Sequence, residues 1–313
     1  MRYHASVFQP HFRPGIEVGG PSVKTAIVVD ADPLVEAALA RSLNTGSWSI
    51  RHVCNNSTAL ALAEVIPCDL ILTSEKTSGG EDLELLRKLR RVRPHIKLII
   101  LTDEATPSDV IASMREHAFS YFSRPFSFES LARMIRSAAV GPCWDEGIEV
   151  LSATPAWMRL AVSCDLKTAQ RLVEFINEFV DIADSEREDV ATAFREILWN
   201  ALEHGAQFNP NEFVEVSYIP ARRMIICRVK DPGEGFSMDQ LRHTALAIPI
   251  EDPIRHSAFY EAQGQRPGGY GLLLARELVD ELIYDEKGND VLLIKYLDSS
   301  RSSKLAKGKA LGA

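Results

Sequence analysis

Short apolar runs alternate with helix-like segments over residues 23–140, and this alternation constrains the fold more than any other feature of the sequence. The runs TAIVVD, DLILT and KLIILT are rich in Ile, Val and Leu and are typical of buried strands. The segments between them, such as residues 33–43 and 82–91, carry apolar residues three and four positions apart, as helices do. Strands alternating with helices form a parallel sheet with helices on both faces. We therefore expect an α/β domain here, a flavodoxin-like doubly wound parallel sheet.

Length and charge limit what the whole chain can be. Its 313 residues suit two domains of about 100 to 200 residues each. The 43 acidic and 35 basic residues give a net charge of -8, which argues against direct nucleic-acid binding as the main activity, because neutralising phosphates needs a basic surface. The cysteines are scattered without a CxxC pair, so neither a zinc site nor a disulfide framework is indicated. No apolar run approaches the roughly 20 residues of a membrane span, and we expect a cytoplasmic protein with no membrane partner.

Composition also divides the chain. Residues 1–22 contain Gly and Pro without hydrophobic periodicity, so we expect a flexible leader. Residues 299–313 are rich in Ser, Lys and Gly and are expected to form a disordered basic tail. Glycines and prolines over residues 141–150 indicate a linker. The second domain should therefore span residues 151–298.

The polar residues at the ends of the apolar runs resemble those of response-regulator receiver domains. VVDADP stands where receivers have an acidic cluster after the first strand, and DLILTS where the third strand ends in the phosphate-accepting Asp. LIILT stands where the fourth strand ends in Thr or Ser, and YFSRPF where a Lys-Pro pair follows the fifth. On this resemblance Asp30 and Thr102 keep the receiver pattern. Ser74 replaces the phosphate-accepting Asp, and Arg124 replaces the Lys.

These replacements remove the chemistry of aspartyl phosphorylation. That reaction needs a carboxylate nucleophile, further acids to hold magnesium, and a Lys to neutralise the phosphoryl oxygens. Ser74 has no carboxylate, and Ala31 removes a second acid. Asp32 and Glu75 are each one position out of register, which re-aims a side chain at a strand end. We therefore predict a pseudo-receiver that transmits or docks without being phosphorylated.

The second domain has a different order of elements. Ser185 with Glu188 three residues later has the pattern of a capping box, and Gly205 is typical of a helix end. Helices segregated from mostly antiparallel strands indicate an α+β sandwich. The expected order is two short strands (148–152 and 157–163), two helices (166–180 and 185–204), two strands (212–219 and 223–230), a helix (271–282) and a last strand (290–297).

Three motifs follow one another in this domain. In REILWNALEHG, Glu196 and Asn200 lie four residues apart and so point from one face of a helix. In VKDPGEGF, Asp231 stands beside Gly233 and Gly235 after a strand. In RPGGYGLLLARELVDEL, glycines lead into a helix N-terminus, whose free N–H groups can bind phosphates. Singly, each motif is usually a solvated helix face, a turn or a loop. The ordered set is a much stronger signal.

The ordered set resembles the N, G1 and G2 boxes of the GHKL family, which contains gyrase, heat-shock chaperone ATPases, histidine kinases and mismatch-repair ATPases. Within that family it is most similar to the anti-sigma factor serine kinases. The resemblance implies that ATP and magnesium bind, with Asn200 coordinating the magnesium that bridges the phosphates. Glu196 would be the general base. Asp231 would bond the adenine amino group, with Gly233 and Gly235 allowing close approach of the backbone.

The same resemblance implies a lid over the phosphates. Gly268, Gly269 and Gly271 would close over them at the start of the next helix, and Arg266 would add a positive charge there. The preceding segment, residues 237–266, is longer than expected for the compact serine kinases and departs from the family pattern.

Two functions remain open at this point. The first is an anti-sigma-type serine/threonine protein kinase, which would phosphorylate an antagonist protein and so release or capture a sigma-like partner. The preserved Glu196 favours it. The second is an ATP-gated module that sequesters a protein partner without phosphotransfer, which the long lid and the degenerate receiver favour. A histidine autokinase is disfavoured because no His stands in a phospho-accepting helix. Kinases of this kind often dimerise, which leaves a homodimer open.

Overall fold

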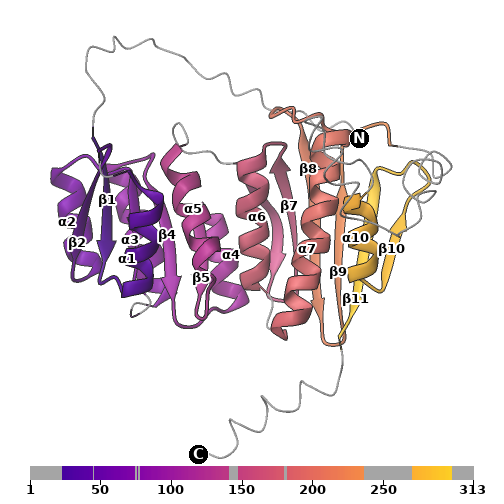
Figure 1. Ribbon diagram of the computed structural model, residues 1–313, viewed down its shortest axis with the longest axis horizontal. Helices are drawn as coiled ribbons and strands as arrows, with labels where there is room; N and C mark the ends of the chain where they lie inside the picture. The colour runs from indigo at the N-terminus through magenta and orange to yellow at the C-terminus, as the bar shows by residue number, and fades with distance from the viewer. Residues whose placement is uncertain are drawn as a thin grey trace, which may run out of the picture.

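The computed structural model describes residues 23–297 except 45, 75, 77, 141–146, 180–181 and 236–269. Two sheets lie one after the other along the molecule, each with its own helices (Figure 1). The expected leader, the basic tail and the whole of the long segment 237–266, Arg266 included, lie outside the described residues, as do Gly268 and Gly269.

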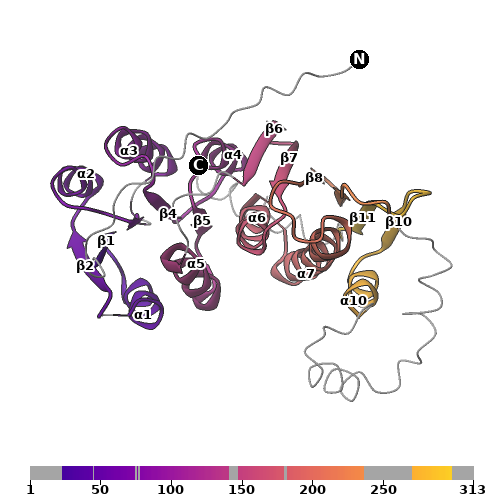
Figure 2. The ribbon, with the colours of Figure 1, turned by 90° about the horizontal axis from the view of Figure 1, so that it is seen from above.

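The N-terminal domain is a five-stranded parallel sheet in the order β2-β1-β3-β4-β5. Helices α1 and α5 cover one face, and α2, α3 and α4 cover the other (Figure 2). This confirms the flavodoxin-like doubly wound sheet. The strands are β1 (Lys24–Val29), β2 (Trp48–Val53), β3 (Leu70–Leu72), β4 (Lys97–Thr102) and β5 (Ser120–Ser123). The helices are α1 (Pro33–Ser42), α2 (Asn56–Val65), α3 (Gly79–Val92), α4 (Pro107–Arg115) and α5 (Phe128–Val140).

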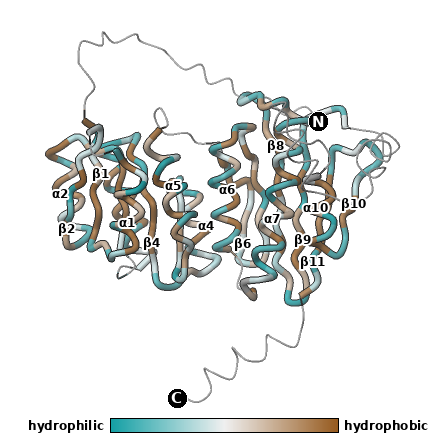
Figure 3. The backbone as a smooth tube through the Cα atoms, viewed as in Figure 1, coloured by the Kyte–Doolittle hydropathy of each residue, from teal (hydrophilic) through white to brown (hydrophobic). Residues whose placement is uncertain are grey.

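The apolar runs form the central strands, and β1 and β4 are brown, the hydrophobic colour, over most of their length in Figure 3. Every residue of β3 and β4 is buried, because helices cover the sheet on both faces. Strand β2 lies at the edge of the sheet and keeps exposed polar residues, so no apolar run marks it in the sequence. Helix starts follow local chemistry: the side chain of Asp32 caps α1, and Ser78 with Glu81 forms a capping box at α3.

The C-terminal domain is a six-stranded antiparallel sheet in the order β10-β11-β9-β8-β7-β6. Its helices lie on one face, seen from above in Figure 2, which confirms the α+β sandwich. Strand β6 begins at Ile148, inside the stretch expected to be a linker. The strands are β6 (Ile148–Thr154), β7 (Trp157–Ser163), β8 (Phe213–Ala221), β9 (Met224–Lys230), β10 (Glu281–Tyr284) and β11 (Asp290–Tyr296). The helical elements are α6 (Leu166–Phe179), α7 (Asp184–Asn200), a π turn η1 (Ala201–Gly205) and α10 (Tyr270–Leu278).

The expected capping box at the start of α7 is wrong. The N-cap is Ala183, and no side chain forms a cap hydrogen bond there. Ser185 and Glu188 lie inside the helix instead, because α7 begins at residue 184, one position before the expected cap. The spacing of the two residues matched a capping box, but the helix start lies upstream of it.

The end of the third helix of this domain also differs from the expectation. Helix α10 ends at Leu278 instead of continuing to Leu282. Residues 281–284 form β10, which pairs antiparallel with β11 and places Leu282 opposite Leu293. A short apolar run such as ELIY fits a helix or a strand equally well by periodicity, and pairing with the neighbouring strand decides between them.

The two domains share a packed interface. Helix α6 lies beside β5, and α4 lies beside β6 (Figures 1 and 2). Met114 of α4 and Ile148 of β6 belong to one cluster of buried hydrophobic side chains that continues into both domains. The apolar core of the C-terminal domain is therefore joined to that of the N-terminal domain.

Helix α6 also presents charged side chains to the N-terminal domain. Arg171, Glu174 and Glu178 lie three and four positions apart and so share a face. The Nε of Arg171, which is buried, donates to the carbonyl oxygen of the residue preceding β5 over 2.9 Å. Arg133 of α5 donates to Glu174 over 2.9 Å. The backbone N–H of Ser123 donates to Glu178 over 2.9 Å, and its hydroxyl donates to the same carboxyl. Each buried charge of α6 thus has a partner in the other domain.

Stability should therefore depend on pH through Glu178. Burial raises the pKa of this carboxyl to about 7, from an ordinary value of 4.5, although hydrogen bonds from Ser123 and the charge of Arg187 lower it. Between these two values the folded chain binds the proton and the unfolded chain does not, so the stabilisation is complete below pH 4.5 and is lost as the pH rises through 7. Between pH 5 and 8 we expect a loss of about 2 to 3 kcal/mol.

Urea denaturation at these two pH values measures this loss. Glu178→Gln cannot titrate and should lack that part of the pH dependence, whereas Glu188→Gln, at an exposed position on α7, should keep it. An identical pH dependence in wild type and Glu178→Gln would show that Glu178 is ionised in the folded chain.

Candidate functional site

The first motif lies at the carboxyl end of α7. Asn200 is the last residue of this helix and Glu196 stands one turn earlier, and both are half-buried. The helix then widens into the π turn η1, closed by a hydrogen bond of 3.0 Å from Ala206 N–H to the carbonyl of Ala201. Single π turns inside helices are frequent at functional sites.

The second motif packs directly on this turn. A Cβ atom at Gly205 would lie 2.2 Å from Cγ of Asp231, so only glycine fits between the turn and the carboxylate. The backbone N–H of Gly233 donates to Oδ1 of Asp231 over 2.8 Å. The side-chain amide of Asn289, the residue before β11, donates to the carbonyl of Gly233 over 2.9 Å and so links the loop to the start of that strand. Gly205 and Gly233 therefore allow the π turn and the loop of the second motif to pack closely against each other.

Gly235 closes the described part of this loop. Its φ of +79° lies in the left-handed region that glycine adopts readily. A Cβ atom there would lie 2.0 Å from the carbonyl oxygen of Lys287. Any other residue at this position would therefore meet both backbone strain and a clash.

The carboxylate of Asp231 lies between the loop of the second motif and the π turn. It is half-buried, and burial raises the pKa of its carboxyl, while the N–H of Gly233 lowers it. Its carboxylate has two oxygens, and the hydrogen bond from Gly233 uses only Oδ1. A partly desolvated acceptor on a rigid loop suits a specific donor of a bound molecule.

The third motif meets the first through Gly271. A Cβ atom at Gly271 would lie 2.6 Å from Oε2 of Glu196, so the carboxylate lies against the first turn of α10. The structure thus brings Glu196, Asn200, Asp231, Gly233 and Gly271 to the carboxyl end of α7, whereas Gly235 lies against Lys287. The other predicted residues of the third motif lie in the part of the chain that is not described.

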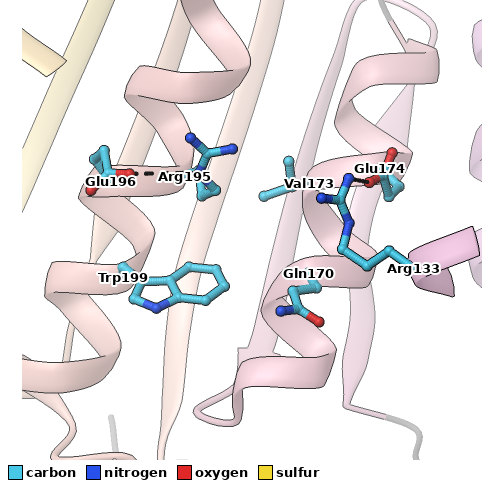
Figure 4. A pocket seen from close by; sticks show the side chains of 7 residues that line it. All are labelled: Arg133, Gln170, Val173, Glu174, Arg195, Glu196 and Trp199. Atoms are coloured by element: carbon cyan, nitrogen blue, oxygen red, sulfur yellow. Dashed lines mark hydrogen bonds and ion pairs between the residues drawn. The ribbon is translucent and has the colours of Figure 1, made fainter. Parts of the chain in front are cut away.

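A cavity of about 220 Å³ opens on the other side of Glu196, between α6 and α7 (Figure 4). Nε of Arg195 lies 3.6 Å from Oε1 of Glu196, and the ring of Trp199 borders the same space. Arg133, from the receiver half, reaches the cavity as well. Sequence reasoning singled out Glu196 but missed Arg133, Arg195 and Trp199, because no motif signals a cavity that forms only where two domains pack. The lining residues are Arg133, Gln170, Val173, Glu174, Arg195, Glu196 and Trp199.

The predicted degenerate receiver residues meet at the carboxyl edge of the first sheet. Asp30 follows β1, Ser74 lies just beyond β3, Thr102 ends β4 and Arg124 follows β5. Ser74 is buried, and its hydroxyl oxygen accepts from a backbone N–H. Neighbouring parallel strands bring their carboxyl ends together, which explains why residues so distant in sequence share this place.

Basic side chains of the chain itself neutralise the acids at this edge. Nζ of Lys76 lies 2.6 Å from Oδ2 of Asp30. The guanidinium of Arg124 forms a salt bridge with Asp32, whose other carboxylate oxygen caps α1. Asp32 therefore serves as a helix cap and an ion-pair partner.

Acetyl phosphate should accordingly leave the receiver half unmodified. Ser74 offers no carboxylate to form an acyl phosphate, and Asp30 and Asp32 are already paired with bases. Intact-mass spectrometry after incubation with acetyl phosphate and magnesium should show no added phosphate. Stoichiometric labelling that disappears in Asp30→Asn would contradict the prediction of a pseudo-receiver.

The comparisons with known proteins agree with this division. Residues 26–136 match the family model of the response regulator receiver domain, and residues 162–295 match that of the histidine kinase-like ATPase domain. The chain therefore consists of a receiver domain followed by a histidine kinase-like ATPase domain of GHKL type.

The individual relatives resemble the receiver half. The transcriptional regulatory protein TcrA of Mycobacterium tuberculosis is 27% identical over 124 residues, which cover 40% of this chain and 49% of that protein. The response regulator MprA of Mycobacterium sp. (strain KMS) is 27% identical over 121 residues, 39% of this chain and 53% of that protein. A CheY-like receiver domain protein from Methanospirillum hungatei is 25% identical with a TM-score of 0.32 and covers 37% of this chain and 92% of that one. The chain spans about a quarter to a half of the length of the first curated relatives.

The described residues contain neither a membrane-spanning helix nor a cluster of metal ligands. No helix in the described ranges is both long and apolar enough to cross a membrane. Across the same ranges, no three His, Cys, Asp or Glu side chains stand close enough to hold a metal ion by themselves.

Proposed function

We propose that this chain is an ATP-dependent regulatory protein whose C-terminal domain is a serine/threonine protein kinase of the anti-sigma type, acting on an antagonist protein in the cytoplasm. The match to the histidine kinase-like ATPase family supports the binding of ATP. The observation that carries the finer proposal is the contact of Glu196 with Gly271: a carboxylate in the position of a general base lies beside the first turn of α10.

The described residues fit a nucleotide. Gly205 and Gly271 let Asp231 and Glu196 pack closely around the carboxyl end of α7, where the nucleotide would bind. The carboxylate of Asp231 retains an acceptor for an exocyclic amine, which adenine has and guanine lacks at the same ring position. Asn200, at the end of α7, would hold the magnesium ion through its side-chain oxygen, as hard cations prefer oxygen ligands.

ATP, when bound, supplies the phosphoryl group and, with its magnesium ion, the charge neutralisation of the transfer. The residues of the chain would hold the reacting groups in position and supply a general base. Glu196 would take the proton of the acceptor hydroxyl at its carboxylate, and its backbone on α7 fixes that carboxylate one turn from Asn200. Such a base typically contributes about 10²- to 10⁴-fold in rate.

An ATP-gated module that sequesters its partner without phosphotransfer is the second candidate. Two features of the receiver half favour it. Asp30 and Asp32 are paired with Lys76 and Arg124. Glu174 and Glu178 of α6 form hydrogen bonds with residues of the receiver half. In that case, nucleotide binding alone would set the affinity for the partner, a sigma-like factor or its antagonist.

Labelled ATP distinguishes the two candidates. The purified chain is incubated with magnesium, ATP labelled on the γ-phosphate, and candidate antagonist domains. The kinase proposal expects label on a serine of one of these domains. Binding of both ATP and partner without any transfer would favour the sequestering module.

A further inference from the structure

The cavity beside Glu196 belongs to both domains. Gln170 and Glu174 come from α6, and Arg195 and Glu196 from α7. Arg133 enters it from α5 of the receiver half and is held there by its bond to Glu174 (Figure 4). Glu196 forms the boundary: one face of its side chain lies against Gly271, and the other borders the cavity. A group in this cavity would approach Glu196 from the side away from α10.

The charge that this cavity presents to solvent is positive. The side chains of Arg133 and Arg195 are each 45% exposed, whereas those of their partners Glu174 and Glu196 are 8% and 26% exposed. Burial raises the pKa of Glu174, and the charge of Arg133 lowers it. The two guanidiniums therefore have N–H donors available for an incoming anion, whereas the carboxylates of Glu174 and Glu196 are less exposed to solvent.

The cavity can hold a side chain rather than a free nucleotide. Its 220 Å³ lies below the about 300 to 1,000 Å³ of usual small-molecule pockets. Trp199 and Val173 add an apolar wall that suits the stem of an acidic side chain. A carboxylate between two guanidiniums can form the strong, geometrically specific pairs that arginine favours.

We propose that this cavity binds an acidic side chain of the partner protein next to its acceptor serine, and that Arg133 and Arg195 determine this specificity. The inference rests on the proposed kinase and deepens it. It also gives the pseudo-receiver a part in the site, since the receiver half supplies Arg133 without being phosphorylated.

Short fluorescent peptides test the inference on the full chain. Three peptides carry a serine flanked by Glu, by Gln or by Lys, and fluorescence anisotropy measures their binding with and without ATP and magnesium. We expect the Glu peptide to bind about tenfold more tightly than the Gln peptide, and the Lys peptide most weakly. Arg195→Gln and Arg133→Gln should each reduce this preference to about twofold or less. Arg136→Gln, which removes an exposed charge from α5 outside the cavity, should keep it.

The variant Arg133→Lys separates an effect on peptide specificity from an effect on the packing of the two domains. Arg133→Gln removes the partner of the buried Glu174, whereas Lys keeps the positive charge and should retain most of the preference. Equal binding of the Glu and Gln peptides, or full preference in both Arg195→Gln and Arg133→Gln, would overturn the inference. A chain that prefers acidic peptides but transfers no phosphate would refute the kinase alone, and one that transfers without this preference would refute the cavity assignment alone.

Discussion

Asp231→Asn should weaken ATP binding about ten- to hundredfold. The variant keeps the size of the side chain and removes the charge, and a hydrogen bond to a charged acceptor contributes about 1.5 to 3 kcal/mol. The packing of Asp231 on Gly205 and its bond from the N–H of Gly233 leave the fold little freedom to compensate. Isothermal titration with ATP and magnesium measures the effect.

Glu234→Gln is the matched control for this prediction. It removes one negative charge from the same loop at an exposed position and should leave the affinity for ATP unchanged. Asn200→Asp should also weaken binding, because it places an additional negative charge beside the phosphates of ATP. Wild-type affinity in both Asp231→Asn and Asn200→Asp would refute the site assignment.

Glu196→Gln should reduce phosphotransfer by about 10²- to 10⁴-fold while leaving the affinity for ATP within about twofold. The amide keeps the shape that packs against Gly271 but cannot take a proton at neutral pH. Single-turnover transfer of labelled phosphate, together with titration of ATP binding, separates the two effects. Glu188→Gln, at an exposed position on the same helix, should change neither. If wild type and Glu196→Gln bind ATP equally and neither transfers phosphate, the sequestering module accounts for the chain instead.

Much of the fold could be predicted because the strongest signals are local. Buried parallel strands are continuous apolar runs, and β3 and β4 were visible for that reason. Strand β2 is at a sheet edge and mixes polar with apolar residues. Strand β10 depends on its pairing with β11, which no local pattern contains. The capping box predicted at Ser185 was wrong because a Ser and a Glu three residues apart also occur inside helices, so their spacing alone does not mark a helix start.

The candidate site was predictable only where motifs carry it. Asp231, Gly233 and Gly271 stood out by their spacing, and the structure brings them to one end of α7. The packing of Gly205 on Asp231 was not foreseen, because it depends on how β9 meets the π turn. Arg133 could not be connected with Glu196, since their proximity follows from the docking of two domains.

Hydrogen exchange of the full chain, with and without ATP and magnesium, tests the central claim most directly. Mass spectrometry of peptic fragments locates the amides that a bound nucleotide protects. The account predicts saturable binding with protection at the carboxyl end of α7, residues 200–205, and in the loop at residues 231–235. Absence of binding at millimolar ATP, or protection confined to the receiver half, would contradict it.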